Sequence, residues 1–155
     1  MSHIAVFPGS FDPITRGHES IVRRVLPLFE KIIVAIGVNS HKNYFYPLER
    51  RKEFIQQTFA DAPSVEVATF SGLTIDYCRS VHAKYIIRGL RTTTDLEFEK
   101  AIAQMNKSMA EEIETLFILP TPELSAINST IIRDIVRNGG DASKFVPPGI
   151  NLKIK

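Results

Sequence analysis

Short apolar runs rich in β-branched residues alternate along this chain with longer segments in which apolar residues recur at helical spacing. The short runs predict strands at residues 4–7, 32–36, 65–67, 85–87 and 116–119. The longer segments predict helices at about 17–29, 73–81, 95–110 and 129–138, and a further helix opened by Pro47. Strands that alternate with helices in this way are typical of an α/β fold with a mostly parallel sheet.

The length and composition of the chain fit one domain. Of the 155 residues, 44% are apolar and 23% are charged, close to the average of globular proteins. We find no internal repeat or linker, so we predict a single domain over 1–155. We see neither a secretory signal nor an apolar run of the roughly 20 residues that a membrane-spanning helix needs. We therefore expect a cytoplasmic enzyme or binding domain with no membrane partner.

The charged residues and the cysteine content exclude several classes of protein. The net charge is only +2, with basic residues alternating with acidic ones, whereas nucleic-acid-binding domains concentrate positive charge on one face. Cys78 is the only cysteine, which excludes an internal disulfide and a cysteine-based zinc cluster. It falls in an apolar-periodic helix, which favours a packing role. The clusters Arg23-Arg24 and Arg50-Arg51-Lys52 are most simply interpreted as solvated helix faces.

The loop after the first predicted strand carries residues suited to an anionic ligand. In an open α/β sheet, ligands bind beyond the carboxyl ends of the strands. Gly9 allows the backbone to approach a ligand closely, and Gly17 with His18 opens a helix whose N–H groups and dipole favour an anion. Ser10 and His18 offer hydrogen bonds to a phosphate there. An ordinary helix-capping turn is the alternative interpretation of the Gly-His pair.

The loop after the fourth predicted strand contains two arginines. Arg88 and Arg91 follow a buried strand directly, and Gly89 frees the backbone to turn between them. A guanidinium presents a planar fork of donors that matches phosphate oxygens. Two solvated surface arginines are the alternative, but the position of Arg88 against the apolar strand favours a ligand site.

A third loop, residues 124–133, leads into the last predicted helix. Asn128, Ser129 and Thr130 are all favourable residues at a helix N-terminus. Beside the first two loops, this segment offers a second helix N-terminus to the same anionic ligand. Lys42, in the loop after the second strand, adds a cation, although a lysine in a loop is usually just solvated.

The remaining patterns indicate structure more than chemistry. The phosphate-binding loop that ends in Gly-Lys-Ser/Thr is absent from the sequence. In the predicted helix 95–110, apolar residues form one stripe; they are Phe98, Ile102, Met105 and Met109.

Taken together, the three loops resemble those of the bacterial phosphopantetheine adenylyltransferases, a family of the nucleotidyltransferase superfamily. The resemblance covers essentially the whole chain and is carried by Pro8-Gly9-Ser10-Phe11-Asp12-Pro13-Ile14-Thr15, Thr15-x-Gly17-His18, Ile87-Arg88-Gly89-Leu90-Arg91 and Asn128-Ser129-Thr130-Ile131-Ile132-Arg133. It implies transfer of the adenylyl group of ATP to 4′-phosphopantetheine, the penultimate step of coenzyme A synthesis, with Mg²⁺ as cofactor. It also implies a Rossmann-like, doubly wound sheet of five parallel strands in the order 3-2-1-4-5, and a homohexamer. In that strand order the His18 and Arg88 loops are neighbours.

The resemblance also implies roles for individual residues. The implied catalytic residues are His18, Lys42, Arg88 and Arg91. The implied phosphopantetheine-binding residues are Ser10, Lys42, Thr74 and Arg88. The implied ATP-binding residues are Ser10, Phe11, His18, Gly89, Leu90, Arg91, Glu99, Leu124, Ser125, Ala126, Ile127, Asn128, Ser129 and Thr130. No protein ligand for the metal is assigned, and the contact made by Asn128, which stands where relatives often have serine, stays open.

The implied acceptor explains why no general base is evident. A phosphate monoester has a second pKa near 6, so at neutral pH it is already an anionic nucleophile. Two unit charges about 4 Å apart repel by roughly 4 kcal/mol at an effective dielectric constant near 20. We therefore expect the protein to position and neutralise two anions for a direct in-line attack.

Other functions stay open from the sequence alone. A nucleotidyltransferase of the same superfamily could use another acceptor, such as nicotinamide mononucleotide, or carry out cytidylyl transfer. A non-catalytic sensor could use the same loops only to bind ATP. An RNA-binding module is the weakest alternative, since the basic residues form no stripe.

Overall fold

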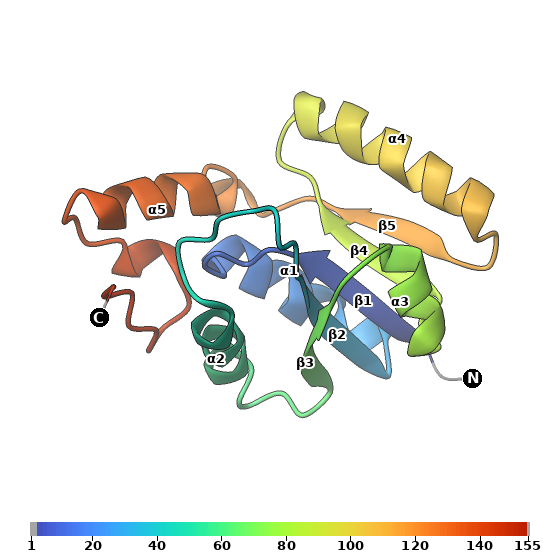
Figure 1. The fold of residues 1–155 in the computed structure, drawn as a ribbon, viewed down its shortest axis with the longest axis horizontal. Coiled ribbons are helices and arrows are strands. Elements are labelled where there is room, and N and C mark those ends of the chain that lie inside the picture. Colours follow the sequence, from blue (N-terminus) through green and yellow to red (C-terminus); the bar gives the residue numbers. More distant parts are fainter. Residues whose placement is uncertain (1–2, 155) are drawn as a thin grey trace.

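The computed structural model describes residues 3–154, so residues 1, 2 and 155 of the predicted single domain lie outside the described part. Its five-stranded sheet consists of β1 (Ile4–Gly9), β2 (Lys31–Gly37), β3 (Val65–Phe70), β4 (Tyr85–Gly89) and β5 (Glu114–Ile118). The strands are parallel and lie in the order β3-β2-β1-β4-β5 (Figure 1). The α/β class, the Rossmann-like architecture and the strand order are therefore confirmed.

Each predicted helix is present, with ends that differ by a few residues. Within residues 3–154 the α-helices are α1 (Arg16–Val25), α2 (Leu48–Thr58), α3 (Thr74–Ser80), α4 (Thr93–Met109) and α5 (Ser129–Arg137). The largest difference is at the end of α1, which stops at Val25 and continues as a 3₁₀ turn over Leu26–Leu28. Pro27 lies in that turn, and proline cannot donate the N–H that a continued α-helix needs.

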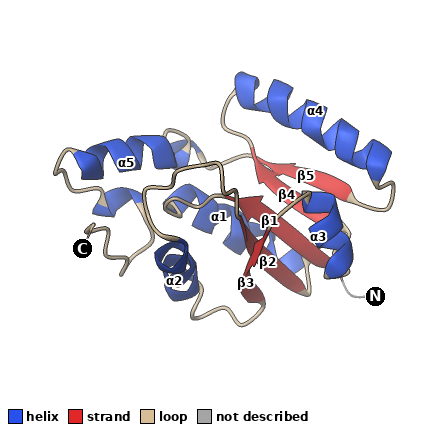
Figure 2. Cartoon of the chain, in the orientation of Figure 1, coloured by secondary structure: helices blue, strands red, loops and turns tan. Residues whose placement is uncertain are grey.

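Side chains along the central strands alternate between two apolar layers, as strand geometry requires. In β1, Ala5 and Phe7 join the cluster formed with α1, α2 and α5, whereas Val6 joins the cluster beneath α3. The same alternation holds in β2, where Ile32, Val34 and Ile36 face the first layer and Ile33 and Ala35 the second. Helices thus bury both faces of the sheet, the doubly wound arrangement (Figure 2).

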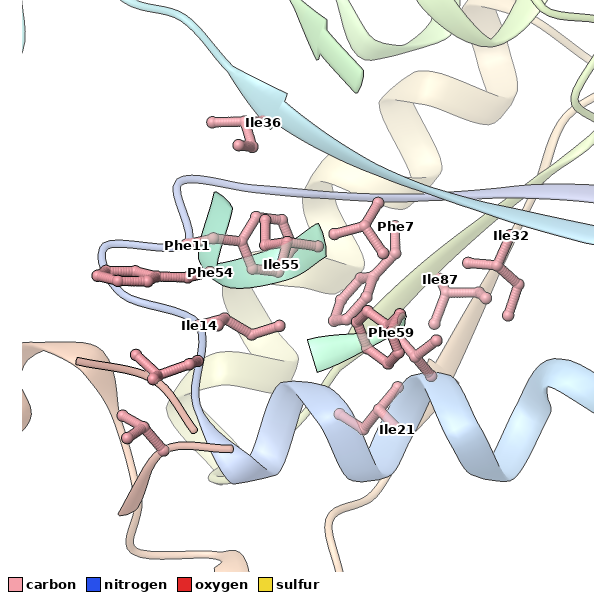
Figure 3. Packing of buried hydrophobic residues seen from close by; sticks show 14 of the residues in the cluster. Phe7, Phe11, Ile14, Ile21, Ile32, Ile36, Phe54, Ile55, Phe59 and Ile87 are labelled. Carbon is pink, nitrogen blue, oxygen red and sulfur yellow. The ribbon is translucent and has the colours of Figure 1, made fainter. Parts of the chain in front are cut away.

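The larger apolar cluster extends beyond the sheet into the loop after β1. Phe11 and Ile14 of that loop are buried with Ile21 of α1 and with Phe54 and Ile55 of α2 (Figure 3). A loop that contributes side chains to the core has little freedom to move. The segment between β1 and α1 is therefore held rigidly at the carboxyl edge of the sheet.

The apolar stripe predicted on α4 is present, but it is not part of the core. Phe98 is 67% exposed and Met105 is 65% exposed, and Ile102 and Met109 are exposed as well. Figure 1 shows α4 at the β4–β5 end of the sheet, away from α1 and α2. No other element of residues 3–154 covers this face of the helix.

The side chain of Cys78 is packed inside the protein. The thiol is fully buried in α3, and burial raises its pKa to about 11, which confirms its packing role.

No helix within residues 3–154 combines the length and the hydropathy needed to cross a bilayer.

Candidate active site

The loops that follow β1 and β4 lie side by side at the point where the strand order reverses. β1 pairs with β4 through Val6 and Ile86, so both strands end at the same edge of the sheet. There the guanidinium of Arg88 donates a hydrogen bond of 2.7 Å to the carbonyl of Pro8. The predicted proximity of the His18 and Arg88 loops is confirmed, at the place where open α/β sheets bind ligands.

Two adjoining cavities open at this edge. The larger has a volume of about 350 Å³ and lies between the β1 loop, the end of β4 and the starts of α1 and α5. The smaller, of about 280 Å³, lies between the β1 loop, α3 and α4. The two share one wall, made of Pro8, Gly9, Ser10, Arg88 and Glu99. A ligand in one cavity would therefore meet a ligand in the other at Ser10 and Arg88.

Most of the predicted site residues line these cavities. The larger is lined by Ser10, Phe11, His18, Arg88, Gly89, Arg91, Glu99, Leu124, Ile127, Asn128, Ser129 and Thr130. The smaller adds Thr74. Four predicted residues of the described chain lie outside both walls: Lys42, Leu90, Ser125 and Ala126. Leu90 is buried and donates its backbone N–H to the carbonyl of Ile118.

The ring of His18 is part of the N-terminal cap of α1. Thr15 is the N-cap, and its hydroxyl accepts the N–H of His18 at 3.2 Å. In return, Nδ1 of His18 accepts the backbone N–H of Thr15 at 3.0 Å. A nitrogen that accepts cannot carry the proton, so the ring is neutral and its proton is on Nε2. The side chain therefore presents a neutral N–H donor in a residue that lines the larger cavity.

The surroundings of His18 keep the ring neutral. Burial, together with the positive charges of Arg88 and Arg91, lowers its pKa to about 4. The ring packs edge-on against Phe11, with centroids 4.9 Å apart. Phe11 is itself buried at a positive φ of 47°, a conformation that costs free energy for a side chain of this size.

The Phe11 ring packs so closely against the backbone at position 9 that only glycine fits there without a shift of the ring. A Cβ atom at position 9 would lie 3.1 Å from the Phe11 ring, closer than ordinary van der Waals contact. The sequence predicted Phe11 on the side of the nucleotide, and it does line the larger cavity. The structure adds a second role, because the same ring supports both the backbone at Gly9 and the imidazole of His18.

Arg88 belongs to β4 rather than to the loop after it, so the predicted end of that strand is wrong by two residues. Its guanidinium makes a two-point ion pair with Glu99 of α4, with Nε to Oε1 at 2.8 Å and Nη2 to Oε2 at 2.9 Å. With the bond to Pro8, three of the five N–H donors of Arg88 are used, and two are left for a ligand. Glu99 thus fixes Arg88 in the wall between the cavities.

Arg91, in the loop after β4, has fewer bonds to the protein than Arg88 has. Its side chain is exposed and lies 3.7 Å from the carboxylate of Asp95, and its backbone N–H donates to the same carboxylate. Asp95 lies in the first turn of α4, where Thr92 is the N-cap. Arg91 is therefore held less tightly than Arg88 and can reach a ligand by changing rotamer.

The start of α5 closes the larger cavity on the opposite side. Asn128 is the N-cap, since its side-chain oxygen accepts the N–H of Ile131 at 2.9 Å. The expected capping role is therefore confirmed, and the contact of Asn128 with a nucleotide stays a prediction. The hydroxyl of Ser129 donates to the carbonyl of Pro13 at 2.9 Å, which ties α5 to the β1 loop. Two helix N-termini, those of α1 and α5, therefore border one cavity.

Arg133 is a site residue that sequence reasoning missed. It lines the larger cavity, donates to the carbonyl of Asp12 at 2.8 Å and contacts the hydroxyl of Thr130 at 3.1 Å. Its position one turn after Thr130 places both side chains on the same helix face, and that spacing could have identified it.

Lys42 lies at the rim of the site. Its ammonium donates to the hydroxyl of Ser10 at 3.2 Å, so it reaches the shared wall although it lines neither cavity. The predicted solvated face at Arg50-Arg51-Lys52 is wrong for Arg51, which is only 3% exposed. The guanidinium of Arg51 donates to the carbonyls of Ser10 and Tyr46 instead.

The carboxylates of the larger cavity already accept hydrogen bonds from the protein. Asp12 accepts from two backbone N–H groups, Glu99 from Arg88, and Asp95 from the backbone of Arg91. Within residues 3–154, no group of three or more His, Cys, Asp or Glu side chains is arranged to hold a metal ion.

The sequence matches the cytidylyltransferase-like family over residues 6–135. The phosphopantetheine adenylyltransferase of Flavobacterium psychrophilum is 53% identical over 149 residues, which cover 96% of this chain and 98% of that protein. The enzyme of the same name from Bacteroides thetaiotaomicron is 42% identical over 96% of this chain and 97% of its own. The chain belongs to the phosphopantetheine adenylyltransferase family. Membership over nearly the full length confirms the resemblance drawn from the three loops.

Solved structures of other adenylyltransferases share the fold of this family member. A nicotinate-nucleotide adenylyltransferase described as putative, from Vibrio parahaemolyticus, superposes with a TM-score of 0.74 at 20% identity, over 97% of this chain and 96% of that chain. The bifunctional NMN adenylyltransferase/ADP ribose pyrophosphatase of Francisella tularensis gives a TM-score of 0.70 at 21% identity, over 94% of this chain and 44% of its own. At such identities the likeness shows the fold alone, so it does not favour a nicotinamide-type acceptor.

Proposed function

We propose that this protein transfers the adenylyl group of ATP to 4′-phosphopantetheine, which yields dephospho-coenzyme A and pyrophosphate. The observation that carries the proposal is the pair of cavities that meet at Ser10 and Arg88, with His18 on the wall of the larger one. The reaction brings two anionic substrates together, and this arrangement gives each a cavity and puts cations where they meet. The adenylyl-transferring relatives at 53% and 42% identity support the same assignment.

ATP occupies the larger cavity in this proposal. Its walls hold two helix N-termini and the cations Arg88, Arg91 and Arg133, a combination suited to a triphosphate. The acceptor occupies the smaller cavity, where Thr74 and Asn106 offer polar contacts to the amides of the pantetheine arm. Its phosphate lies at the shared wall, within reach of Lys42 and Arg88.

The residues act by positioning and by neutralising charge. An oxygen of the acceptor phosphate attacks the α-phosphorus of ATP, the bond from that phosphorus to the β-bridging oxygen breaks, and pyrophosphate leaves. Lys42 and Arg88 hold the attacking phosphate against electrostatic repulsion. His18 donates its Nε2–H to a non-bridging oxygen of the α-phosphate, where negative charge increases in the transition state. Arg91 and the N-terminus of α5 stabilise the departing pyrophosphate.

Mg²⁺ is the cofactor in this proposal, bound together with ATP. The carboxylates of the cavity are engaged by protein donors, and Mg²⁺ commonly takes most of its ligands from phosphate oxygens and water. Asp95 is the most exposed of the carboxylates that line the cavity, so it is the one that would contact the hydration shell of the ion. The ion supplies charge neutralisation of the triphosphate.

The assembly and location also belong to the proposal. A homohexamer is supported by the exposed apolar stripe of α4, since a contiguous apolar face of this kind is typical of a protein–protein contact. A cytoplasmic location is supported by the use of ATP as the donor. Neither nucleic acid nor a membrane is a partner in this proposal.

The decisive experiment is to incubate the protein with ATP, Mg²⁺ and 4′-phosphopantetheine and to detect dephospho-coenzyme A by mass and pyrophosphate by a coupled assay. His18→Ala serves as the control for contaminating activity. Parallel reactions with nicotinamide mononucleotide and with CTP test the other acceptor and donor classes. Product from those mixtures alone would contradict the proposal, and ATP binding without any product would favour a nucleotide sensor.

A further inference from the structure

Two oppositely charged residues are buried beside the shared wall of the cavities. Asp12, in the β1 loop, is 5% exposed, and Arg51, on α2, is 3% exposed. They are not within ion-pair distance of one another in the structure, and each is satisfied mainly by backbone groups. Charged side chains are seldom buried to this extent unless the bonds they make are needed.

Together these two side chains fasten the loop after β2 to the loop after β1. The carboxylate of Asp12 accepts the backbone N–H groups of Phe45 and Tyr46, at 2.7 and 2.8 Å. Arg51 donates from Nε to the carbonyl of Tyr46 at 3.0 Å and from Nη1 to the carbonyl of Ser10 at 2.8 Å. The backbone at 45–46 is thus bonded from both sides.

The same network reaches Lys42 through an aromatic ring. Arg51 lies under the ring of Tyr44, with Cζ 4.0 Å from the ring centroid. The ammonium of Lys42 lies 5.5 Å from the centroid of the same ring and donates to the hydroxyl of Ser10. Tyr44 is therefore in contact with both cations, and Ser10 is bonded by Lys42 through its side chain and by Arg51 through its backbone.

A purely structural role would not need a guanidinium here. An apolar side chain of similar volume in a buried position often stabilises a fold as well as a buried charge does. The guanidinium supplies directed hydrogen bonds to two loops at once, and those loops carry Ser10 and Lys42. The bonds hold the backbones of the two loops together before any ligand arrives.

We propose that Arg51 and Asp12 are positioning residues that hold Lys42 and Ser10 in place for the acceptor phosphate. This inference rests on the proposed function. Asp12 also lines the larger cavity, but in this proposal both residues affect the acceptor through Lys42 and Ser10. Preorganisation of this kind lowers the free-energy cost of immobilising a flexible lysine when the acceptor binds.

The test is a double-mutant cycle on activity, with Arg51→Met, Lys42→Met and the double variant. We expect Arg51→Met to raise the KM for 4′-phosphopantetheine about tenfold and to change the KM for ATP less than twofold. In the Lys42→Met background, Arg51→Met should change the KM for 4′-phosphopantetheine less than twofold, because its effect passes through the missing lysine. Equal effects on both substrates, or additive effects in the cycle, would overturn the inference.

Arg50→Met is the matched control on the same helix. Arg50 also stacks on Tyr46 and donates to backbone carbonyls, but those carbonyls belong to Asn151 and Lys153 near the end of the chain. It should lower thermal stability without changing the KM for 4′-phosphopantetheine. Arg51→Lys should restore part of the acceptor affinity, since an ammonium can bond one carbonyl but has no planar fork.

Asp12→Asn provides an independent variant if Arg51→Met fails to fold. It retains one side-chain oxygen for the two N–H groups of Phe45 and Tyr46, so we expect a several-fold rise in the same KM and the same non-additivity with Lys42→Met. Additivity there would also overturn the inference. A wild-type protein that makes no dephospho-coenzyme A would instead contradict the proposed function, which keeps the two failures distinct.

Discussion

The imidazole of His18 accepts the backbone N–H of Thr15 at 3.0 Å, in the position that glutamate or glutamine usually takes in a helix capping box. The ring is thereby held by the first turn of the helix that it caps. Protonation of Nδ1 would break this bond and would place a cation beside Arg88 and Arg91. The capping bond therefore requires the neutral ring, in keeping with its lowered pKa, and the donor role proposed for Nε2 uses the same form.

The lowered pKa of His18 predicts a pH-dependent stability. The folded-state pKa is about 4 and the unfolded value about 6.5, so between these values only the unfolded chain binds the proton. The contribution of His18 is fully present above pH 6.5 and is lost as the pH falls toward 4, by up to about 3 kcal/mol. Urea unfolding at several pH values between 4 and 7.5 should show this slope in the free energy of unfolding.

His18→Gln is the control for that slope. Glutamine can accept the N–H of Thr15 but does not titrate, so the difference in stability between the wild type and this variant should vary with pH between 6.5 and 4. A constant difference would contradict the assignment of the low pKa to His18.

His18→Ala should lower kcat by about 10²–10³, the usual effect of removing one preorganised donor, and change substrate binding much less. Steady-state kinetics with both substrates measures the two effects separately. Full activity in His18→Ala would remove this residue from the catalytic role. Loss of the cap should also lower the free energy of unfolding by about 1 kcal/mol.

The ion pair between Arg88 and Glu99 predicts which substrate is affected by Glu99→Gln. The sequence assigns Glu99 to ATP, but both of its oxygens bond to Arg88. We expect about a tenfold increase in the KM for 4′-phosphopantetheine, because Arg88 loses the partner that orients it, and a smaller change in the KM for ATP. Glu97→Gln, at an exposed position on the same helix, should change neither. A rise confined to the KM for ATP would favour direct contact of Glu99 with the nucleotide.

Gly9→Ala should destabilise the fold and lower activity together. The new Cβ would lie 3.1 Å from the Phe11 ring, so the ring must move, and overpacking of this kind typically costs about 1–3 kcal/mol. Because Phe11 packs against His18, kcat should fall as well. Gly37→Ala is the stability control, since its Cβ would meet the Phe70 ring at an ordinary 3.6 Å. Equal stability losses in the two variants, measured by thermal unfolding, would contradict this account.

The sequence predicted the features that local pattern determines. Apolar periodicity located each strand and helix, and glycine, proline and capping residues located the loops of the site. The strand order came from the resemblance to a family, because periodicity does not reveal which strands are neighbours. Lys42 and Ser10, 32 residues apart in the sequence, could be placed in one site only in this way.

The features that local pattern did not reveal depend on partners distant in sequence. Arg51 is charged and lies among other charged residues, so its pattern indicates a solvated face, yet it is buried because carbonyls from two loops meet it. The stripe on α4 has the spacing of a core-facing helix, and spacing alone does not say whether the covering surface belongs to the same chain. Arg88 belongs to strand β4, not to the loop after it, because Phe117 of β5 pairs with it.

The exposed apolar stripe of α4 predicts a contact between copies of the chain. Met105 is 65% exposed on this stripe. The substitution Met105→Glu should prevent the face from being buried against another copy of the chain, because an unpaired charge at an apolar contact is strongly unfavourable. By light scattering the wild type should be a hexamer and Met105→Glu a smaller species. Gln104→Glu, the same new residue at the adjacent exposed position, should leave the assembly unchanged.

The kinetic consequence of Met105→Glu follows from the position of α4. Ile102 and Asn106 of this helix line the smaller cavity, so a contact that holds α4 in the proposed hexamer would also shape the proposed acceptor site. We therefore expect the smaller species to show a raised KM for 4′-phosphopantetheine and a nearly unchanged KM for ATP. A hexamer that persists in Met105→Glu would place the subunit contact elsewhere on the molecule, and a monomeric wild type would contradict the proposed assembly altogether.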